Sequence, residues 1–298
     1  MRLVSDLRRG GWDVRCLVRD ASKARALGGA ELAIGDVTDP ASLRGIAYGV
    51  DVVFHLAAIG DVNASGGRAL RSYRRVNVEG TKNVLAECEG LRLKKFVHFS
   101  SVAAMGRPKK AGTMDERDRC RPVTPYEISK RESELAVLDA WRRKRVPAVV
   151  IRPVMVSGRG ERKESKKLET SVRMRAVPII GDGSSMIHSV HVDDVVRAAV
   201  AAASRGRPGQ AYILCGSSET WNDAVDNLAK RRNIRITKMH VPLPIARHAV
   251  ALAERAFNAA GIVPIFTTER LERLGCRAGY DCSKARKELV FRARKNEK

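Results

Sequence analysis

The stretch MRLVSDLRRGGWDVRCLVRD, residues 1–20, decides the fold, because it reads as a helix, a Gly-Gly turn and then a strand. Further short apolar runs follow it through the first half of the chain, with polar helical stretches between them. Strands that alternate with helices predict βαβ units, and hence an α/β fold with a doubly wound parallel sheet covered on both faces. The predicted strands are VRCLVR (14–19), ELAIGD (31–36), DVVFHLAA (51–58), KFVHFSS (95–101) and AVVIRPV (148–154).

The pattern changes near residue 155. Residues 179–203 read as a turn, a strand and an Ala-rich helix that begins near Asp193, and AYILCGS (211–217) reads as a strand. The remainder reads as helices and loops. We therefore predict a sheet-bearing portion over residues 1–155 and a smaller lobe over 156–298, of which residues 189–215 pack back on the sheet.

Composition and charge describe a folded, strongly basic protein. The 298 residues are 44% hydrophobic, which is enough for a core, and the formal net charge is +23. The basic residues come in many short groups, and the few aromatic residues do not interleave with them, so no base-stacking platform is indicated. A solvated basic surface is the expected interpretation, and nucleic acid or an anionic membrane as a partner is the alternative.

The sequence offers no membrane span and no metal cluster. No apolar run reaches about 18 residues, and we expect a cytoplasmic protein. Residues 242–265 read as an amphipathic helix, for which core packing or a substrate lid is expected and peripheral membrane contact is the alternative. His188 and His191 lie near Asp193, but we expect Asp193 to cap a helix rather than to bind a metal. The cysteines form no Cys-x-x-Cys pair, which predicts free thiols in a reducing compartment; they stand at positions 16, 88, 120, 215, 276 and 282.

The segment TPYEISKRESELAVLDAW (124–141) is the most informative for chemistry. Tyr126 and Lys130 lie four residues apart and therefore share one face of a helix, which Pro125 suits as a first turn. An ammonium near a phenol favours the phenolate, so such a Tyr can exchange a proton with a hydroxyl or a ketone. Ser100 and Ser101 follow a predicted strand, at the edge where open parallel sheets bind ligands. A hydroxyl there suits a hydrogen bond to the reacting oxygen, with a turn or a helix cap as the alternative role.

Several motifs, in order along nearly the whole chain, resemble the extended short-chain dehydrogenase/reductase family. This is the group of NAD(P)-dependent epimerases and dehydratases and of enzymes similar to 3β-hydroxysteroid dehydrogenase. The motifs are GDVTDP (35–40), VFHLAA (53–58), RVNVEGT (75–81), VHFSSVAAMG (97–106), PYEISK (125–130), IRPVMVSG (151–158), HVDDV (191–195) and YDCSKARKEL (280–289). The resemblance implies a Rossmann-like, dinucleotide-binding portion over residues 1–155 and a mainly substrate-binding lobe over 156–298.

The resemblance also implies site residues. Tyr126 matches the catalytic acid/base, Lys130 the residue that lowers the pKa of that Tyr and holds the nicotinamide ribose, and Ser101 the hydroxyl that orients the substrate oxygen. No metal is implied. The cofactor-binding positions that it implies are Arg19, Asp36, Val37, Leu56, Ala57, Ala58, Asn77, Tyr126, Lys130 and Pro153.

One family motif, the strand and glycine-rich loop that receive the cofactor diphosphate, is not found in the sequence. The match begins just after the position of the last loop glycine, so we expect the predicted strands at 14–19 and 51–58 each to lack a neighbour. Unpaired amides in a buried sheet cost about 1–3 kcal/mol each. We therefore hypothesise roughly 10–15 further residues before Met1, one strand and its turn; the alternative is a shortened chain that binds dinucleotide weakly.

Two features narrow the chemistry. Arg19 ends a predicted strand where an acidic residue would hold the ribose of NAD, and an Arg there suits the 2′-phosphate of NADP. Family members that act on nucleotide sugars carry polar residues at the positions of Met155 and Ile187, which are apolar here. We therefore expect NAD(P), with a preference for NADP, and interconversion of a secondary alcohol and a ketone on a sterol-, isoprenoid- or flavonoid-like small molecule.

The alternatives are a nucleotide-sugar epimerase or dehydratase, and a non-catalytic basic scaffold that binds RNA or an anionic membrane. A homodimer is a further expectation.

Overall fold

The main sheet of the protein is parallel and has four strands. The computed structural model describes residues 1–22, 27–60, 66–106, 112–158, 164–259, 268, 271 and 279–294. The strand order is β10-β6-β4-β3, and β4 pairs in parallel with both β3 and β6. The strands are β3 (Val52–His55), β4 (Lys95–Phe99), β6 (Ala148–Pro153) and β10 (Ala211–Leu214).

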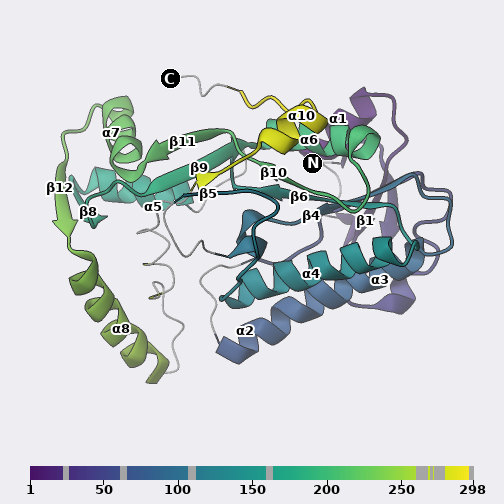
Figure 1. Ribbon diagram of the computed structural model, residues 1–298, viewed down its shortest axis with the longest axis horizontal. Helices are drawn as coiled ribbons and strands as arrows, with labels where there is room; N and C mark the ends of the chain where they lie inside the picture. Colours follow the sequence, from purple (N-terminus) through teal and green to yellow (C-terminus); the bar gives the residue numbers. More distant parts are fainter. Residues whose placement is uncertain are drawn as a thin grey trace.

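Helices cover both faces of this sheet, as Figure 1 shows. Side chains alternate between the faces along β4, so Phe96 joins one core cluster and Val97 the other. Strand β6 is buried along its whole length, as in a parallel sheet between two helical layers. One layer holds α2 (Gly66–Tyr73), the π-helical segment η3 (Arg74–Glu79), α3 (Gly80–Cys88) and α4 (Pro125–Arg142); the other holds α1 (Arg2–Arg9), α6 (Val192–Arg205) and α10 (Ser283–Glu288). The α/β, doubly wound fold predicted from the sequence is confirmed.

Strands β1 (Arg15–Val18) and β2 (Glu31–Ile34) form a separate two-stranded parallel sheet. Among the described residues, β1 pairs only with β2, and β3 pairs only with β4. The two-stranded sheet and the main sheet instead contact each other through side chains. One such contact is an edge-to-face pair of Trp12 and Phe54, with ring centroids 6.3 Å apart. The sheet is therefore divided at the point where the sequence predicts that two strands lack a neighbour.

The chain returns to the main sheet after residue 185. β9 (Met186–His191) pairs in parallel with β7 (Met155–Ser157) and antiparallel with β11 (Ser217–Thr220). Helix α6 then packs on β4 and β6, and β10 joins the edge of the main sheet beside β6. The exact division at residue 155 stays a prediction.

A smaller unit lies at the end of the molecule opposite β1 (Figure 1). β8 (Ala176–Ile180) pairs in parallel with β12 (Thr237–Val241), beneath α5 (Glu164–Arg173) and α7 (Trp221–Arg232). Val172, Val177, Ile179 and Val225 are its core. Helix α8 (Leu243–Ala259) follows β12 and extends away from the sheets. The remaining elements are the short helices η2 (Pro40–Leu43) and η4 (Val102–Met105) and the paired strands β5 (Thr113–Met114) and β13 (Gly279–Tyr280).

Two local predictions are wrong. The region after residue 217 contains strands as well as helices, since β11, β12 and β13 are short and pair with distant segments rather than showing an apolar run of their own. Asp193 does not cap α6. His191 does so, because its Nδ1 accepts a hydrogen bond from the backbone N–H of Asp193 at 3.2 Å. The Asp193 carboxylate instead pairs with Arg2 and Arg294.

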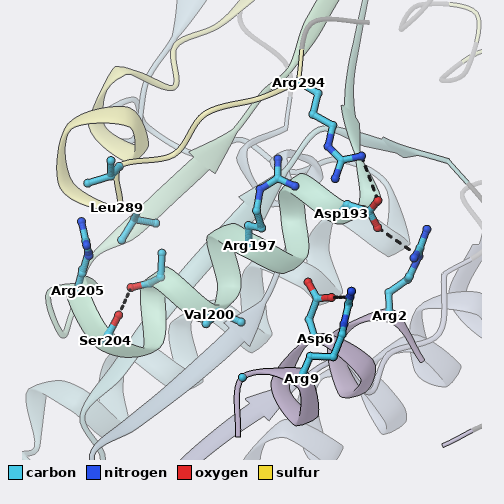
Figure 2. Close-up of a pocket in the computed structure, with 13 residues that line it drawn as sticks. Arg2, Asp6, Arg9, Asp193, Arg197, Val200, Ser204, Arg205, Leu289 and Arg294 are labelled. Atoms are coloured by element: carbon cyan, nitrogen blue, oxygen red, sulfur yellow. Dashed lines mark hydrogen bonds and ion pairs between the residues drawn. The ribbon is translucent and has the colours of Figure 1, made fainter. Parts of the chain in front are cut away.

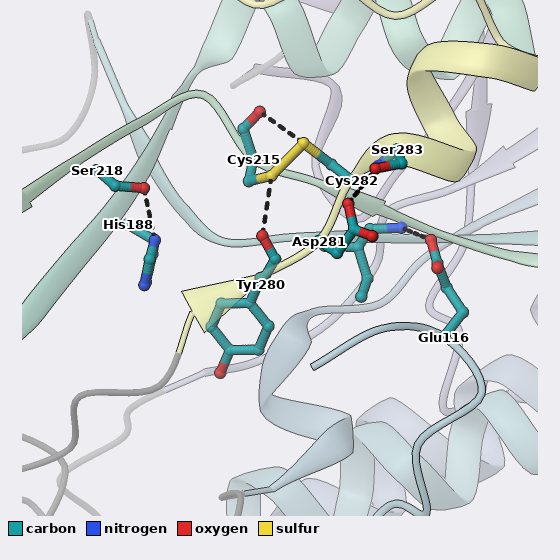
Figure 3. Close-up of a disulfide and its surroundings, with 9 residues drawn as sticks. Glu116, His188, Cys215, Ser218, Tyr280, Asp281, Cys282 and Ser283 are labelled. Atoms are coloured by element: carbon teal, nitrogen blue, oxygen red, sulfur yellow. Dashed lines mark hydrogen bonds between the residues drawn. A yellow bond between two sulfur atoms is a disulfide. The ribbon is translucent and has the colours of Figure 1, made fainter. Parts of the chain in front are cut away.

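The prediction of free thiols is wrong for two cysteines. Cys215, directly after β10, forms a disulfide with Cys282, directly before α10, with Cα atoms 5.9 Å apart (Figure 3). The two lie 67 residues apart in sequence, and the contact of α10 with β10 and the pairing of β13 with β5 hold their segments near each other. Cys16, Cys88 and Cys120 are free thiols. Cys276 lies outside the described residues.

Candidate active site

The N-terminus of α4 fixes the position of Tyr126. Thr124 and Glu127 form a capping box, in which the Thr124 side chain accepts from the Glu127 N–H and the Glu127 carboxylate accepts from the Thr124 N–H. Pro125 occupies the first turn, where its missing N–H costs nothing. Tyr126 therefore lies in a helical turn with a defined start, and Lys130 lies one turn further along the same face.

Lys130 ties α4 to the end of β4. Its Nζ donates a hydrogen bond to the carbonyl oxygen of Phe99 at 2.7 Å, and Phe99 is the last residue of β4. Two residues later the Ser101 side chain caps η4 by accepting from the Ala103 N–H at 3.1 Å, and η4 packs against α4. The structure thus brings Lys130 and the Ser101 segment together, and Ser101 has the cap role that the sequence left as an alternative.

The ring of Tyr126 is held on two sides. It packs edge-to-face on Tyr73 of α2, with ring centroids 6.1 Å apart. Gly60, in the segment after β3, lies so close that a Cβ there would be 3.0 Å from Cε2 of the Tyr126 ring. Tyr126 itself is partly exposed.

Asn77 secures the segment that carries Gly60. Its Oδ1 accepts from the Ile59 N–H at 2.8 Å, and its Nδ2 donates to the Ile59 carbonyl and to Ser129 Oγ, both at 3.0 Å. It is 1% exposed and lies in the π-helical segment η3, a type of distortion often found at functional sites. Both N–H groups of the amide are used, so the structure assigns Asn77 to holding this segment; direct contact with a cofactor stays a prediction.

The site has an unusual electrostatic environment beneath Lys130. Burial lowers the pKa of Lys130 to about 8, although the Glu134 carboxylate opposes this change. Burial, with a smaller contribution from Lys130, also lowers the pKa of His55 to about 3, and it holds the pKa of His98 well below its usual value. The two imidazoles stack with centroids 5.6 Å apart and are neutral at neutral pH, so they add no positive charge beside the ammonium.

A buried ion pair fixes the other side of α4. Glu134 and Arg152 are fully or almost fully buried, and their hydrogen bonds are 2.8 and 2.9 Å long. Arg152 precedes Pro153 at the end of β6, so this pair holds α4 against the strand that ends beside the predicted site.

The predicted cofactor residues divide into exposed and buried groups. Leu56, Ala57 and Ala58, directly after β3, and Arg19, directly after β1, are exposed. Asp36 is partly exposed after β2, and hydrogen bonds from Thr38, with smaller effects of Arg19 and Arg75, lower the pKa of its carboxyl group. The ends of β1, β2 and β3 therefore form an accessible edge that suits the binding of a dinucleotide.

Val37 and Pro153 are buried instead. The side chain of Val37 packs so closely on α3 that a Cβ at Gly80 would be 2.8 Å from it, and the carbonyl oxygen of Val37 accepts a hydrogen bond from Asn83. Pro153 ends the buried strand β6. The residues present fit the nicotinamide half of a dinucleotide cofactor. We assign none of the described residues to the cofactor diphosphate.

A groove lies elsewhere, between α1, α6 and residues 289–294 (Figure 2). Its volume is about 950 Å³, and its lining includes Asp193, which forms ion pairs with both Arg2 and Arg294. None of the predicted site residues lines this groove. Among the described residues, no group of three or more His, Cys, Asp or Glu side chains could hold a metal ion.

Sequence reasoning did not identify Gly60, Tyr73 or Ser129 as part of the site. Gly60 follows the predicted strand end, and a glycine there is a signal for close approach. Tyr73 and Ser129 gave no such signal, because their contacts depend on how α2 and η3 pack against α4.

A doubly wound sheet with a Ser at a strand end and a Tyr and Lys one helical turn apart defines an oxidoreductase of the extended short-chain class. The chain belongs to the NAD dependent epimerase/dehydratase family, whose model matches residues 1–215. It is an enzyme of the group that contains NAD-dependent dehydrogenases, reductases and epimerases.

Two curated relatives extend the match over most of the chain. A 4-hydroxy-2-methyl-3-oxo-4-farnesyl-3,4-dihydroquinoline-1-oxide ketoreductase of Stigmatella aurantiaca is 29% identical, over 98% of this chain and 88% of its own length. A 3beta-hydroxysteroid-dehydrogenase/decarboxylase isoform 1 of Arabidopsis thaliana is 30% identical, over 82% of this chain but only 58% of its own length.

Solved structures agree with the fold. The crystal structure of gox2253 superposes with a TM-score of 0.79 at 26% identity and covers 98% of this chain and 89% of that one. MoeE5 in complex with UDP-glucose and NAD has a TM-score of 0.72, also at 26% identity, over 99% of this chain and 90% of its own.

Proposed function

We propose that this protein interconverts a ketone and a secondary alcohol on an apolar small molecule, with NADP as the preferred cofactor. The observation that supports the proposal is the hydrogen bond from Lys130 Nζ to the carbonyl oxygen of Phe99. This bond holds the ammonium at the end of β4, which leads to Ser101. Lys130 also shares a helix face with Tyr126. A proton donor, its charge partner and an orienting hydroxyl are then within one small region.

When bound, the cofactor would supply the hydride that the reduction adds to the carbonyl carbon. The Tyr126 hydroxyl donates its proton to the carbonyl oxygen, and the Ser101 hydroxyl donates a hydrogen bond to the same oxygen. The Lys130 ammonium stabilises the phenolate that remains, and a solvent proton restores the phenol. The oxidation of the alcohol uses the same groups in the reverse order.

Two apolar side chains support an apolar substrate. Met155 on β7 stands opposite Ser189 of β9, and Ile187 lies two residues before Ser189, so Met155 and Ile187 share one face of this small sheet. At these positions a diphosphate would find no partner. The farnesylated and steroid substrates in the names of two relatives agree with this interpretation.

The preference for NADP rests on charge at the accessible edge. Arg19 follows β1, and both Arg19 and Arg75 act on the Asp36 carboxylate after β2. Guanidinium groups at this place suit a 2′-phosphate. NAD in the MoeE5 complex shows that a protein of this fold takes the other dinucleotide, so the preference needs a direct comparison of the two.

A nucleotide-sugar epimerase or dehydratase is the second candidate, favoured by the similarity to MoeE5 in complex with UDP-glucose. The test is a panel of a farnesylated ketone, a 3-ketosteroid, UDP-glucose and dTDP-glucose, with NADPH and then NADH. We expect NADPH consumption with an apolar ketone. Conversion of a nucleotide sugar alone would select the second candidate. A homodimer stays a prediction that sedimentation would check.

A further inference from the structure

Helix α8 carries an exposed apolar stripe. Ile245, Ala249, Leu252 and Ala256 follow the spacing i, i+4, i+7 and i+11, which places them on one face of the helix. All four are exposed, and the two large side chains are 62% (Ile245) and 71% (Leu252) exposed. Figure 1 shows α8 at the periphery of the molecule, extending away from the sheets. These side chains therefore pack on no described core.

The opposite face of α8 is the one that the protein buries. Ala246 is 6% exposed, and Val250 and Glu254 are partly buried on the same face, at i+4 and i+8. The Glu254 carboxylate accepts hydrogen bonds from the backbone N–H and the hydroxyl group of Thr268, at 3.1 and 3.0 Å. The helix therefore has a separate face for attachment, and the apolar stripe is not needed for it.

Charge beside the stripe is positive. Arg255 is exposed and lies beside the stripe on the helix surface. The single acidic residue of α8, Glu254, points to the attachment face. The whole chain carries a formal net charge of +23. An apolar stripe with an arginine beside it, on a strongly basic protein, is complementary to an anionic lipid surface.

An apolar pocket lies against the same helix. Its volume is about 560 Å³, and it is lined by Leu243, Pro244, Arg247, His248, Ala251 and Leu271. A hydrocarbon chain suits such a lining. The lining residues that belong to α8 lie in its N-terminal half, and none of them is a stripe residue.

We propose that α8 is a membrane-contact element that lies in the headgroup region of an anionic bilayer, with the Ile245–Leu252 stripe facing the acyl chains. This inference rests on the proposed function in one respect, since an apolar ketone partitions into such a bilayer. The element holds the enzyme where its substrate is concentrated. Within the described residues no helix is long and apolar enough to cross a membrane, so the contact is with the surface.

The test is co-sedimentation of the full chain with two kinds of vesicle, pure phosphatidylcholine and an equal mixture of phosphatidylcholine and phosphatidylglycerol. We expect binding to the mixed vesicles, weaker binding to the neutral ones, and release as salt shortens the screening length. Ile245→Glu and Leu252→Glu should each weaken binding about tenfold or more, because a carboxylate would enter the apolar layer. Arg255→Glu should weaken binding to the mixed vesicles only.

Tyr48→Glu is the matched control, because Tyr48 is 76% exposed on a loop far from α8 in the sequence and should leave vesicle binding unchanged. Circular dichroism and melting curves check that each variant is folded, and Ile245→Ser provides a milder substitution. Equal vesicle binding by the wild-type protein and both stripe variants would overturn the proposal. A stripe variant that turns a dimer into a monomer, without vesicle binding by the wild type, would also overturn it and would show that the stripe joins two copies.

Vesicle binding is measured without turnover, so the two claims fail separately. Binding without reduction of any ketone contradicts the proposed function alone. Reduction of a water-soluble ketone without vesicle binding contradicts the membrane proposal alone.

Discussion

Gly60 lies directly against the ring of Tyr126, and a Cβ at Gly60 would be 3.0 Å from Cε2 and 3.5 Å from Cζ of that ring. The segment that holds Gly60 cannot move away easily, because Asn77 binds both backbone polar groups of Ile59. The position of Tyr126, the proposed acid/base, therefore depends on the absence of a side chain at Gly60, in the segment after β3.

Gly60→Ala should displace the Tyr126 ring and lower kcat about tenfold or more, because small misplacements of a reacting group are costly. The melting temperature should change little, since Gly60 is at the surface. Gly67→Ala in α2 is the control, as a Cβ there meets only Arg71 Nη1, at 3.6 Å. Equal kcat values for the two variants would show that Tyr126 does not need this space.

Lys130 should give cofactor binding a pH dependence. Its pKa is lowered to about 8 by burial, so the ammonium is present below pH 8 and is lost as the pH rises through that value. NADPH affinity should therefore fall above about pH 8, as measured by fluorescence titration. Lys130→Met should bind weakly at every pH and lose this dependence, whereas Tyr126→Phe should keep it. A flat profile in the wild type would contradict the role assigned to Lys130.

The Glu134–Arg152 pair should stabilise the attachment of α4 to β6. Glu134→Gln leaves the Arg152 charge buried without its partner, which should lower the free energy of unfolding by about 3–5 kcal/mol in urea titrations. Glu89→Gln removes a half-exposed partner of Arg145 and should cost about 0–1 kcal/mol. Similar losses in both variants would show that burial does not distinguish the pairs.

The presence of the Cys215–Cys282 disulfide and its effect on stability should both be measurable. Peptide mapping without reductant should recover Cys215 and Cys282 in one cross-linked fragment, and Cys88 as a free thiol. Because the bond closes a loop of 67 residues, its reduction should lower the free energy of unfolding by up to about 4 kcal/mol. Recovery of both as free thiols from unreduced protein would restore the interpretation made from the sequence.

The sequence predicts the parallel strands and the central site because their signals are local. Phe96 and Val97 are adjacent apolar residues that point to opposite faces of β4, and only a sheet covered on both faces buries both of them. Tyr126 and Lys130 are four residues apart, so helical geometry alone places them together. The strand ends that follow Val18, Ile34 and His55 are predicted for the same reason.

The features that the sequence does not predict depend on distant pairing. Met239 of β12 pairs with Pro178 of β8 across 60 residues, and the short stretch around it has charged and polar neighbours. Cys215 meets Cys282 only through the tertiary packing of segments that lie 67 residues apart, including α10 against β10. The sequence favours Asp193 as the cap of α6 because Asp is the commoner cap, whereas the His191 ring nitrogen is positioned by β9.

The most direct test of the account compares the wild-type protein with Tyr126→Phe in NADPH-dependent reduction of an apolar ketone, with NADPH affinity measured on the same samples. The account predicts that the Phe variant loses turnover by several orders of magnitude and keeps most of its NADPH affinity, because only the transferred proton is removed. Undiminished turnover in Tyr126→Phe would contradict the assignment of Tyr126 as the proton donor.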